Sequence, residues 1–264
     1  MAATKPAPEG APKLSARHLA LTFDDGRRRV PVIGDVSFDL HAGEVVAIVG
    51  PSGCGKTTML NAVSGLLKPT GGEVTWNVAM TKRRPRIGYM LQKDLLFPWR
   101  TAKGNVMLGM EIRGDTGAKA HEKARALLDQ LGLHGFADDY PSTLSGGMRQ
   151  RVALARTLIH DPEVLLLDEP FAALDFQTKI LIESDTAKLV RSEGRALLLI
   201  THDLEEAVSM ADRVIVLTGR PTRIKSTYTI ELGGDRTDMM AARESPDFAD
   251  YVRSIWRDLD VAQH

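Results

Sequence analysis

The chain has 264 residues, 43% of them hydrophobic and 26% charged, which is the composition of an ordinary globular protein with a substantial core. Its 34 basic residues equal its 34 acidic ones, and this balance argues against nucleic acid or another polyanion as a partner. The single cysteine excludes an internal disulfide and suits a reducing compartment, and the apolar runs are too short to cross a membrane.

The first third of the chain predicts paired strands followed by a strand–loop–helix unit. Residues 1–13 are rich in proline and are expected to form a disordered lead-in rather than a secretory signal. Apolar and polar residues alternate in Leu19–Phe23 and Val36–Leu40, as in half-buried antiparallel strands. A short buried strand is expected at Glu44–Val49, and a helix at Thr57–Leu66.

The rest of the chain alternates apolar runs with helical patterns. Strands are expected at Glu73–Val78 and Arg86–Leu91, and residues 93–160 are predicted to be mostly helical. Further strands and helices then alternate at Val164–Leu167, Lys179–Ser192, Ala196–Ile200, Leu204–Ala211 and Val214–Leu217. This order predicts an α/β fold with a mainly parallel sheet under helical cover. The tail, 233–264, holds a predicted helix at Phe248–Leu259.

A glycine-rich segment follows the strand Glu44–Val49 and fits the phosphate-binding pattern G-x-x-x-x-G-K-[ST]. Its glycines let backbone N–H groups face phosphates, Lys56 supplies a mobile charge, and the Thr57 hydroxyl is suited to Mg²⁺. The alternative is a plain glycine-rich turn between a strand and a helix. The residues expected to bind the nucleotide here are Gly50, Pro51, Ser52, Gly53, Cys54, Gly55, Lys56, Thr57 and Thr58.

Two adjacent carboxylates follow the apolar strand Val164–Leu167. Ligands of α/β sheets bind at the carboxyl ends of the strands, where these side chains are expected. Asp168 suits support of Mg²⁺, and Glu169 could polarise a water for attack on the γ-phosphate. The alternative is that the two carboxylates only cap a helix or form an ordinary surface pair. The presence of a phosphate-binding loop in the same chain favours the catalytic interpretation over this alternative.

A second anion site is predicted at Leu144–Arg151, which reads LSGGMRQR and opens a helix. Ser145, Gly146 and Gly147 offer a hydroxyl and open amides at a helix N-terminus, although a simple helix cap would use the same serine. Together with the phosphate loop, this segment resembles the signature of the ATP-binding cassette (ABC) ATPases. The resemblance extends over residues 14–232. It implies a P-loop NTPase core, an antiparallel β subdomain and a helical subdomain at about 93–160 that carries the signature.

The resemblance also implies that two copies pair head to tail, so that Ser145, Gly146 and Gly147 of one copy contact the ATP held by the other. It assigns Gln92 to metal contact and to sensing of a membrane partner. It further assigns Asp175 to a loop that communicates across the dimer, where a helix cap is the alternative.

Two more residues gain a role from the resemblance. His202 follows the strand Ala196–Ile200 and matches the histidine that holds the γ-phosphate and the attacking water, although histidines are often structural. Phe23 matches the aromatic residue that stacks on adenine, and its place in an alternating strand equally permits a core side chain. The implied ligands are ATP and Mg²⁺.

Two segments are similar to the nitrate, sulfonate and taurine importer branch of the family: Leu95–Thr101 and Glu169–Asp175, although Ala172 stands where that branch usually has glycine. In such importers a groove near Gln92–Arg100 receives the membrane subunit. Phe97 and Trp99 could form this docking surface or pack locally. The implied partners are a permease and, indirectly, a solute-binding protein, at the cytoplasmic face of the bacterial inner membrane.

Three functions are compatible with these observations. The first is the ATPase of a bacterial importer for a small solute such as a sulfonate, taurine, nitrate or a vitamin precursor. The second is the ATPase of an exporter or lipid-transport complex. The third is a non-transport cassette ATPase, which would normally need a long coiled-coil insertion or two cassettes, and neither fits in 264 residues.

Overall fold

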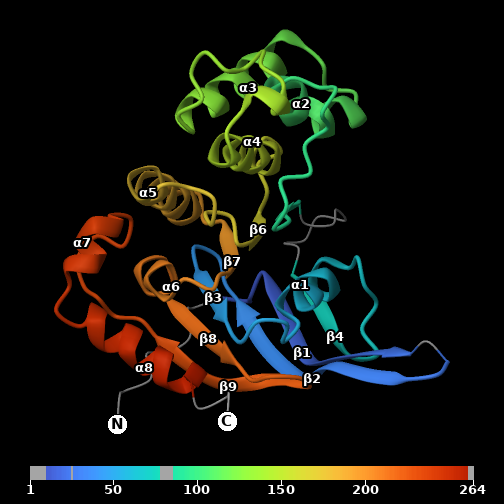
Figure 1. Cartoon of the computed structure of the whole chain (residues 1–264), viewed down its shortest axis with the longest axis vertical. Coiled ribbons are helices and arrows are strands. Elements are labelled where there is room, and N and C mark those ends of the chain that lie inside the picture. Colours follow the sequence, from blue (N-terminus) through green and yellow to red (C-terminus); the bar gives the residue numbers. More distant parts are fainter. Residues whose placement is uncertain (1–9, 25, 78–85, 261–264) are drawn as a thin grey trace.

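The computed structural model describes residues 10–24, 26–77 and 86–260. Within these ranges nine strands form one sheet, in the order β4-β1-β2-β9-β8-β3-β7-β6-β5 (Figure 1). The strands are β1 (Leu14–Asp24), β2 (Arg29–Leu40), β3 (Val45–Val49), β4 (Gly71–Trp76), β5 (Ile87–Met90), β6 (Val164–Asp168), β7 (Ala196–Ile200), β8 (Arg213–Leu217) and β9 (Thr222–Thr229). Of the expected lead-in at residues 1–13, the first nine lie outside the described residues, as do residues 25, 78–85 and 261–264.

The helices cover the sheet and build a separate layer above it. They are α1 (Lys56–Ser64), α2 (Ala102–Ile112), α3 (Ala118–Gln130), α4 (Gly146–Leu158), α5 (Phe176–Ser192), α6 (Leu204–Met210), α7 (Met239–Glu244) and α8 (Phe248–Asp260), with a 3-10 turn at Pro141–Thr143. In the described part of the chain, no helix combines the length and the apolar character that a bilayer crossing requires.

Five neighbouring strands, β8-β3-β7-β6-β5, run parallel to one another. Every residue of β3, β6 and β7 is buried, because helices lie on both faces of this part of the sheet. This burial explains why the three strands read as continuous apolar runs rather than as alternating patterns. The predicted parallel sheet is thus confirmed.

The other edge of the sheet is antiparallel, since β1 pairs with β2 and with β4 in opposite directions. One strand here was missing from the sequence prediction. Strand β9 lies between β2 and β8, parallel to the first and antiparallel to the second. Its sequence, TRIKSTYT, is polar and mostly half-buried, so it lacks the apolar alternation by which a strand is predicted.

Alternating residues of β3 face two different hydrophobic cores. Val45 and Ala47 belong to a cluster with α4 and the other helices above the sheet. Val46 and Ile48 belong to a second cluster with α1 and the strands β1 and β2. Helices α1 and α4, which carry the two predicted anion sites at their N-termini, therefore lie on opposite faces of the sheet.

Helices α2, α3 and α4 form the helical subdomain, grouped at the top of the molecule away from β1 and β2 (Figure 1). The segment predicted to be mostly helical from about residue 93 opens with a loop, and its first helix, α2, begins at Ala102. The side chain of the fully buried Asn105 accepts a hydrogen bond from the N–H of Phe97 and donates to three carbonyls of the preceding loop. These bonds satisfy the loop backbone without a helix.

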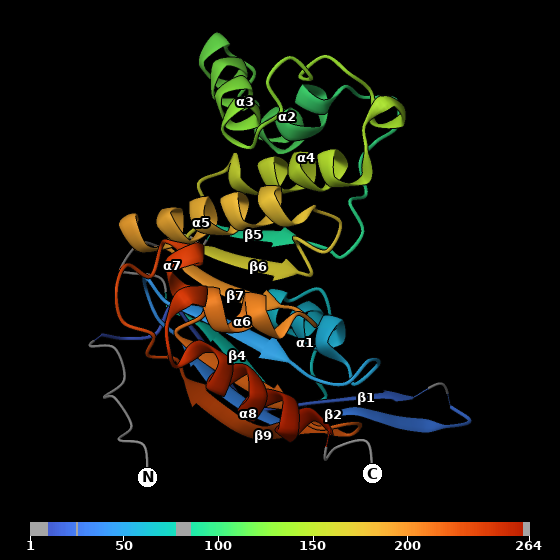
Figure 2. The same ribbon diagram turned by 60° about the vertical axis from the view of Figure 1, so that its left-hand side comes forward.

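The C-terminal segment contains two helices, α7 and α8, where the sequence predicted one. Helix α7 has only six residues, too few for a periodic apolar pattern to show. Both helices lie along the side of the molecule that carries α5 and α6 (Figure 2). Met239, Ala242, Phe248 and Ile255 are buried in the same core as the helices above the sheet. The tail is therefore packed onto the cassette over its described length.

Candidate active site

The predicted phosphate-binding loop connects β3 to α1, as its pattern requires. Two of its glycines, Gly53 and Gly55, have φ angles of +73° and +117°, in the left-handed region where side chains are strained. A Cβ atom on Gly55 would also lie 2.6 Å from Cγ1 of Val32. Glycine is needed at position 55 both for the backbone angle and for the close approach of β2.

Lys56 and Thr57 open helix α1 and point their polar atoms into the same region. The Lys56 ammonium donates to the carbonyl oxygens of Gly50, at 2.8 Å, and Pro51, at 3.2 Å. The Thr57 hydroxyl donates to Oδ2 of Asp168 at 2.6 Å. This last bond connects the phosphate-binding loop directly to the end of β6, two segments that are 111 residues apart in the chain.

Asp168 ends β6 and is almost fully buried. Burial raises the pKa of its carboxyl group; the hydrogen bond from Thr57 acts in the opposite direction, and the neighbouring charge of Glu169 adds to the rise. Among the contacts described here, the Asp168 carboxylate accepts one side-chain hydrogen bond, from Thr57. A cation that binds next to this buried carboxylate would therefore stabilise its charged form.

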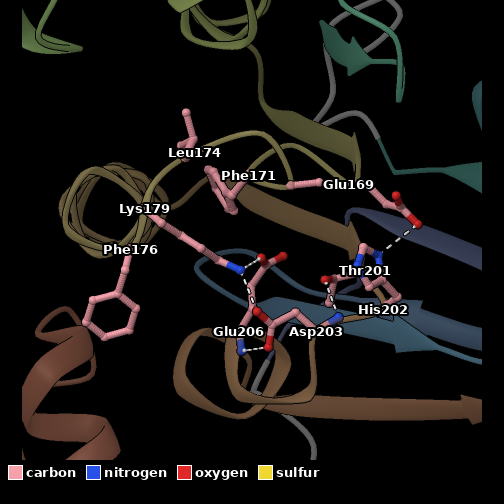
Figure 3. A pocket seen from close by; sticks show the side chains of 10 residues that line it. Glu169, Phe171, Leu174, Phe176, Lys179, Thr201, His202, Asp203 and Glu206 are labelled. Atoms are coloured by element: carbon pink, nitrogen blue, oxygen red, sulfur yellow. Dashed lines mark hydrogen bonds and ion pairs between the residues drawn. The ribbon is translucent and has the colours of Figure 1, made fainter. Parts of the chain in front are cut away.

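Glu169 follows directly, with a positive φ of 50° that is uncommon for a residue with a side chain. Its Oε2 accepts a hydrogen bond from Nε2 of Gln92 at 2.8 Å. Its Oε1 lies 3.2 Å from Nδ1 of His202, a contact that Figure 3 shows. Gln92 follows β5 and His202 follows β7. Three residues that the sequence suggested separately thus meet at the carboxyl ends of neighbouring strands.

A pocket of about 300 Å³ lies beside the Glu169–His202 pair (Figure 3). Its walls combine apolar side chains from the loop after β6 with charged groups of α5 and α6. The lining residues are Glu169, Phe171, Ala172, Leu174, Phe176, Lys179, Thr201, His202, Asp203 and Glu206. Lys179 and Glu206 were not singled out from the sequence, because isolated charges on helices carry no recognisable pattern.

The first turn of α4 contains the signature residues. Oγ of Ser145 accepts from the N–H of Met148 at 3.2 Å, so this serine is the N-cap that the simpler interpretation expected. A Cβ atom on Gly147 would lie 3.0 Å from the carbonyl oxygen of Ala173, which shows that α4 packs tightly on the loop after β6. Sequence reasoning missed Gln150, which fastens these two segments together: its amide donates to the Glu169 carbonyl and accepts from the Ala173 N–H, both at 2.8 Å.

Four other candidate residues have well-defined positions. Asp175 caps α5 by accepting from the N–H of Thr178 at 3.0 Å. Phe23 is 48% exposed, which excludes the core position that its strand pattern allowed. Trp99 is 70% exposed, and its ring centroid lies 5.2 Å from that of Phe97, so the tryptophan is not packed inside the helical subdomain.

The cysteine of the loop, Cys54, is buried, and burial raises the pKa of its thiol. A thiol that stays protonated is a weak nucleophile, so this cysteine is a packing residue of the loop.

Glu183 on α5 is fully buried near Lys179, Asp203, Glu206 and Arg243, and burial followed by the charge of Glu206 raises its pKa from 4.5 to about 8. The folded protein therefore holds this proton more tightly than the unfolded chain does between pH 4.5 and about 8. We expect the free energy of unfolding of the wild type, relative to Glu183→Gln, to fall by a few kcal/mol as the pH rises through this range. Urea titrations of both proteins at several pH values measure this difference. If the difference in unfolding free energy between the two proteins does not change with pH, Glu183 does not hold its proton in the folded protein.

Comparison with known proteins identifies the family. A family model described as ABC transporter matches residues 33–172. The chain is 38% identical to the uncharacterized ABC transporter ATP-binding protein YtlC of Bacillus subtilis, over 94% of this chain and 95% of that protein. It is 39% identical to the taurine import ATP-binding protein TauB of Roseobacter denitrificans, over 92% of this chain and 94% of the relative.

Two solved structures resemble the fold closely. The dimeric structure of MJ0796, a bacterial ABC transporter cassette, matches with a TM-score of 0.75 and 32% identity, over 83% of this chain and 99% of that one. A dimeric post-hydrolysis state of the same cassette, bound to ADP and Pi, matches with a TM-score of 0.74. The chain belongs to the ABC transporter family. It is an ATPase of that family, with the fold that the two sequence motifs indicated.

Proposed function

We propose that this chain is the energy-coupling ATPase of a bacterial importer, and that the imported solute is a small organic sulfonate such as taurine. The observation that carries the catalytic part is the meeting of Gln92, Glu169 and His202 beside the Thr57–Asp168 pair. The taurine import proteins among the relatives, 39% identical over most of the chain, support the importer branch.

The nucleotide site suits ATP in its shape and its charges. The loop Gly50–Thr57 offers backbone N–H groups at glycines that leave room for phosphate, at the N-terminus of α1. The Lys56 ammonium now bonds two loop carbonyls, and phosphate oxygens are stronger acceptors for the same charge. Thr58 in the first turn of α1 is assigned to the α-phosphate. The exposed ring of Phe23 is available to stack on the adenine.

The metal that accompanies ATP in this role is Mg²⁺. Thr57, Gln92 and Asp168 present a hydroxyl, an amide and a carboxylate, the oxygen donors that Mg²⁺ prefers, and phosphate oxygens complete such a site. Among the described residues no cluster of three histidine, cysteine or acidic side chains is suited to a metal by itself, so the proposed site depends on the nucleotide. When bound, the ion would neutralise phosphate charge and favour departure of the leaving oxygen.

Hydrolysis is assigned to Glu169 as the general base. Its carboxylate is fixed by Gln92 on one oxygen and lies next to His202 on the other, so it is oriented before a water molecule arrives. The positive φ of Glu169 is a strained backbone conformation. The hydrogen bond from the Gln150 amide to the Glu169 carbonyl helps to stabilise it. His202 is assigned to hold the γ-phosphate and the attacking water.

Two copies are needed to complete this site. Ser145, Gly146 and Gly147 start α4 on the face of the sheet opposite to α1, which supports their contact with a nucleotide bound by another copy. The dimeric cassettes among the structural relatives support the same arrangement. Asp175 caps the N-terminus of α5. We assign it to the loop through which the two copies of the dimer communicate. Closing this interface is the step that drives transport.

The permease is assigned to the surface at Gln92–Arg100. Asn105 holds this loop rigid from inside, while Leu95 and Trp99 point apolar surface outward. Exposed apolar side chains on a rigid loop are a suitable receptor for a short segment of a membrane subunit. The chain would then sit at the cytoplasmic face of the inner membrane and meet the solute-binding protein only indirectly.

The function is tested with the transporter isolated intact through a tag on this chain. Taurine together with its binding protein should raise ATP hydrolysis by the reconstituted complex several-fold. β-Alanine, which carries a carboxylate in place of the sulfonate, is the matched control and should have no effect. Stimulation by β-alanine and not by taurine would exclude a sulfonate importer. A complex that hydrolyses ATP without any response to sulfonates would contradict the sulfonate class of solute.

A further inference from the structure

A largely buried group of charges, with Asp203 at its half-exposed edge, connects α5 to α6 next to the active site. The Lys179 ammonium lies 2.6 Å from Oδ2 of Asp203 and 2.7 Å from Oε2 of Glu206 (Figure 3), and it lies 3.8 Å from Oε1 of Glu183. The Lys179 side chain is 12% exposed. Ion pairs with so little contact to solvent are weakly screened, and their loss is correspondingly expensive. Lys179 therefore fixes the distance between the two helices.

This lysine acts on the segment that carries His202. Asp203 is the N-cap of α6, where its Oδ1 accepts from the N–H groups of Glu205 and Glu206. The N–H of Asp203 in turn donates to Oγ1 of Thr201. His202 lies between these two fastened residues, and its ring is 3.2 Å from the Glu169 carboxylate. The position of the histidine ring thus depends on the Lys179–Asp203 pair.

Helix α7 of the C-terminal segment reaches the same network from the other side. Arg243 donates to Oε2 of Glu183 at 3.2 Å, and its guanidinium lies 5.6 Å from the ring centroid of Phe176, the first residue of α5. Phe176 directly follows Asp175 and lines the pocket. The tail is therefore connected to the start of α5 and, through Glu183 and Lys179, to the loop of His202.

The network brings two cations and three carboxyl groups together, so its geometry is sensitive to the loss of each member. Two cations, Lys179 and Arg243, face the carboxyl groups of Glu183, Glu206 and Asp203. One carboxylate oxygen of Glu183 and one of Glu206 are buried without a hydrogen-bond partner among the described residues. Removing either cation takes hydrogen-bond donors away from buried carboxyl groups, which must then move toward water or other donors. Such a movement would displace α6 and its N-terminal loop.

We propose that Lys179 is a positioning residue for ATP hydrolysis, and that Arg243 of the C-terminal segment supports it, by holding His202 against Glu169. This inference rests on the proposed role of His202. It gives the C-terminal segment a task in turnover that the sequence did not suggest. Neither side chain touches the reacting atoms, so both act on the turnover number and leave the affinity for ATP unchanged.

The test is a double-mutant cycle on the purified full-length chain. Lys179→Met, Lys179→Arg and Arg243→Met are compared in the wild-type and His202→Ala backgrounds. Arg253→Met is the control, because Arg253 is an exposed arginine of the same segment whose ion pair, with the equally exposed Asp250 one turn earlier, lies outside the network. Phosphate release at saturating ATP gives kcat, titration with ATP gives the dissociation constant, and a thermal melt reports folding.

In the wild-type background we expect Lys179→Met to lower kcat at least tenfold, and Arg243→Met to lower it about threefold, with ATP affinity within twofold. Lys179→Arg should restore most of the activity, and Arg253→Met should match the wild type. In the His202→Ala background both losses should shrink to less than about twofold, because the residue being positioned is absent.

Equal losses in the two backgrounds would overturn the proposal, since they would show an effect that does not pass through His202. An unchanged kcat in Lys179→Met would overturn it as well. If Lys179→Met does not fold, Arg243→Met decides the question by the same comparison. A His202→Ala protein as active as the wild type would instead contradict the proposed role of the histidine, so the two failures are distinguishable.

Discussion

Glu169→Gln should reduce kcat for ATP hydrolysis by roughly 10²–10⁴-fold while leaving the affinity for ATP intact. The amide keeps the size of the side chain but cannot take a proton from water. It can still bond Gln92, whose contact with Oε2 of Glu169 is 2.8 Å, so the fold of the site is preserved. ATP should then be bound without being consumed, and the two copies should stay together around it.

Two measurements check this result. Phosphate release in excess ATP gives the turnover, and size-exclusion chromatography with ATP separates the dimer from the monomer. The variant should elute as a dimer with ATP and as a monomer without it. Glu163→Gln is a matched control, since Glu163 is an acidic residue one position before β6 and outside the pocket. Phosphate release at the wild-type rate would remove Glu169 from the role of base.

Lys56→Ala should abolish ATP binding within the measurable range, which corresponds to a dissociation constant at least about 100-fold above that of the wild type. The lysine brings the one ammonium of the phosphate-binding loop, and its two present acceptors are carbonyls of that loop. A neutral methyl group cannot replace this charge near a polyphosphate. Protein stability should change little, because the side chain is only half-buried.

Titration with a fluorescent ATP analogue measures this effect, with the thermal midpoint as the check on folding. Lys68→Ala is the control, because it removes an exposed lysine just after α1 by the same substitution. Unaltered ATP affinity in Lys56→Ala would refute the nucleotide site. The two variants also differ from each other: Glu169→Gln is expected to bind ATP without hydrolysing it, whereas Lys56→Ala is expected not to bind ATP at all.

Most of the local structure could be predicted from the sequence because its signals are local. The buried strands β3 and β7 are runs of five apolar residues, β6 has four before Asp168, and the helices between them show regular apolar spacing. The phosphate loop could be located because its glycines, Lys56 and Thr57 are contiguous. The same holds for the signature at Ser145. These features need no information from distant parts of the chain.

Other features escaped the sequence because partners far away in the chain create them. Strand β9 is polar and exists because β2 and β8 offer their edges to it. Helix α7 is too short for a pattern, and its place is set by buried Met239 and by Arg243. The exposed position of Phe23, and the loop rather than helix before α2, likewise depend on neighbours in space.

The class of this protein, a nucleotide-binding α/β ATPase with two anion-binding segments, follows from its amino-acid sequence, because each motif is a short run of residues with recognisable chemistry. How the parts act together depends on the folded molecule. It brought Gln92, Glu169 and His202 into contact from three separate strands, and it connected Lys179 and the C-terminal helix α7 to that group. The physical reason is that hydrogen bonds and ion pairs between distant residues depend on the register of the parallel strands and the packing of helices, which no local pattern encodes.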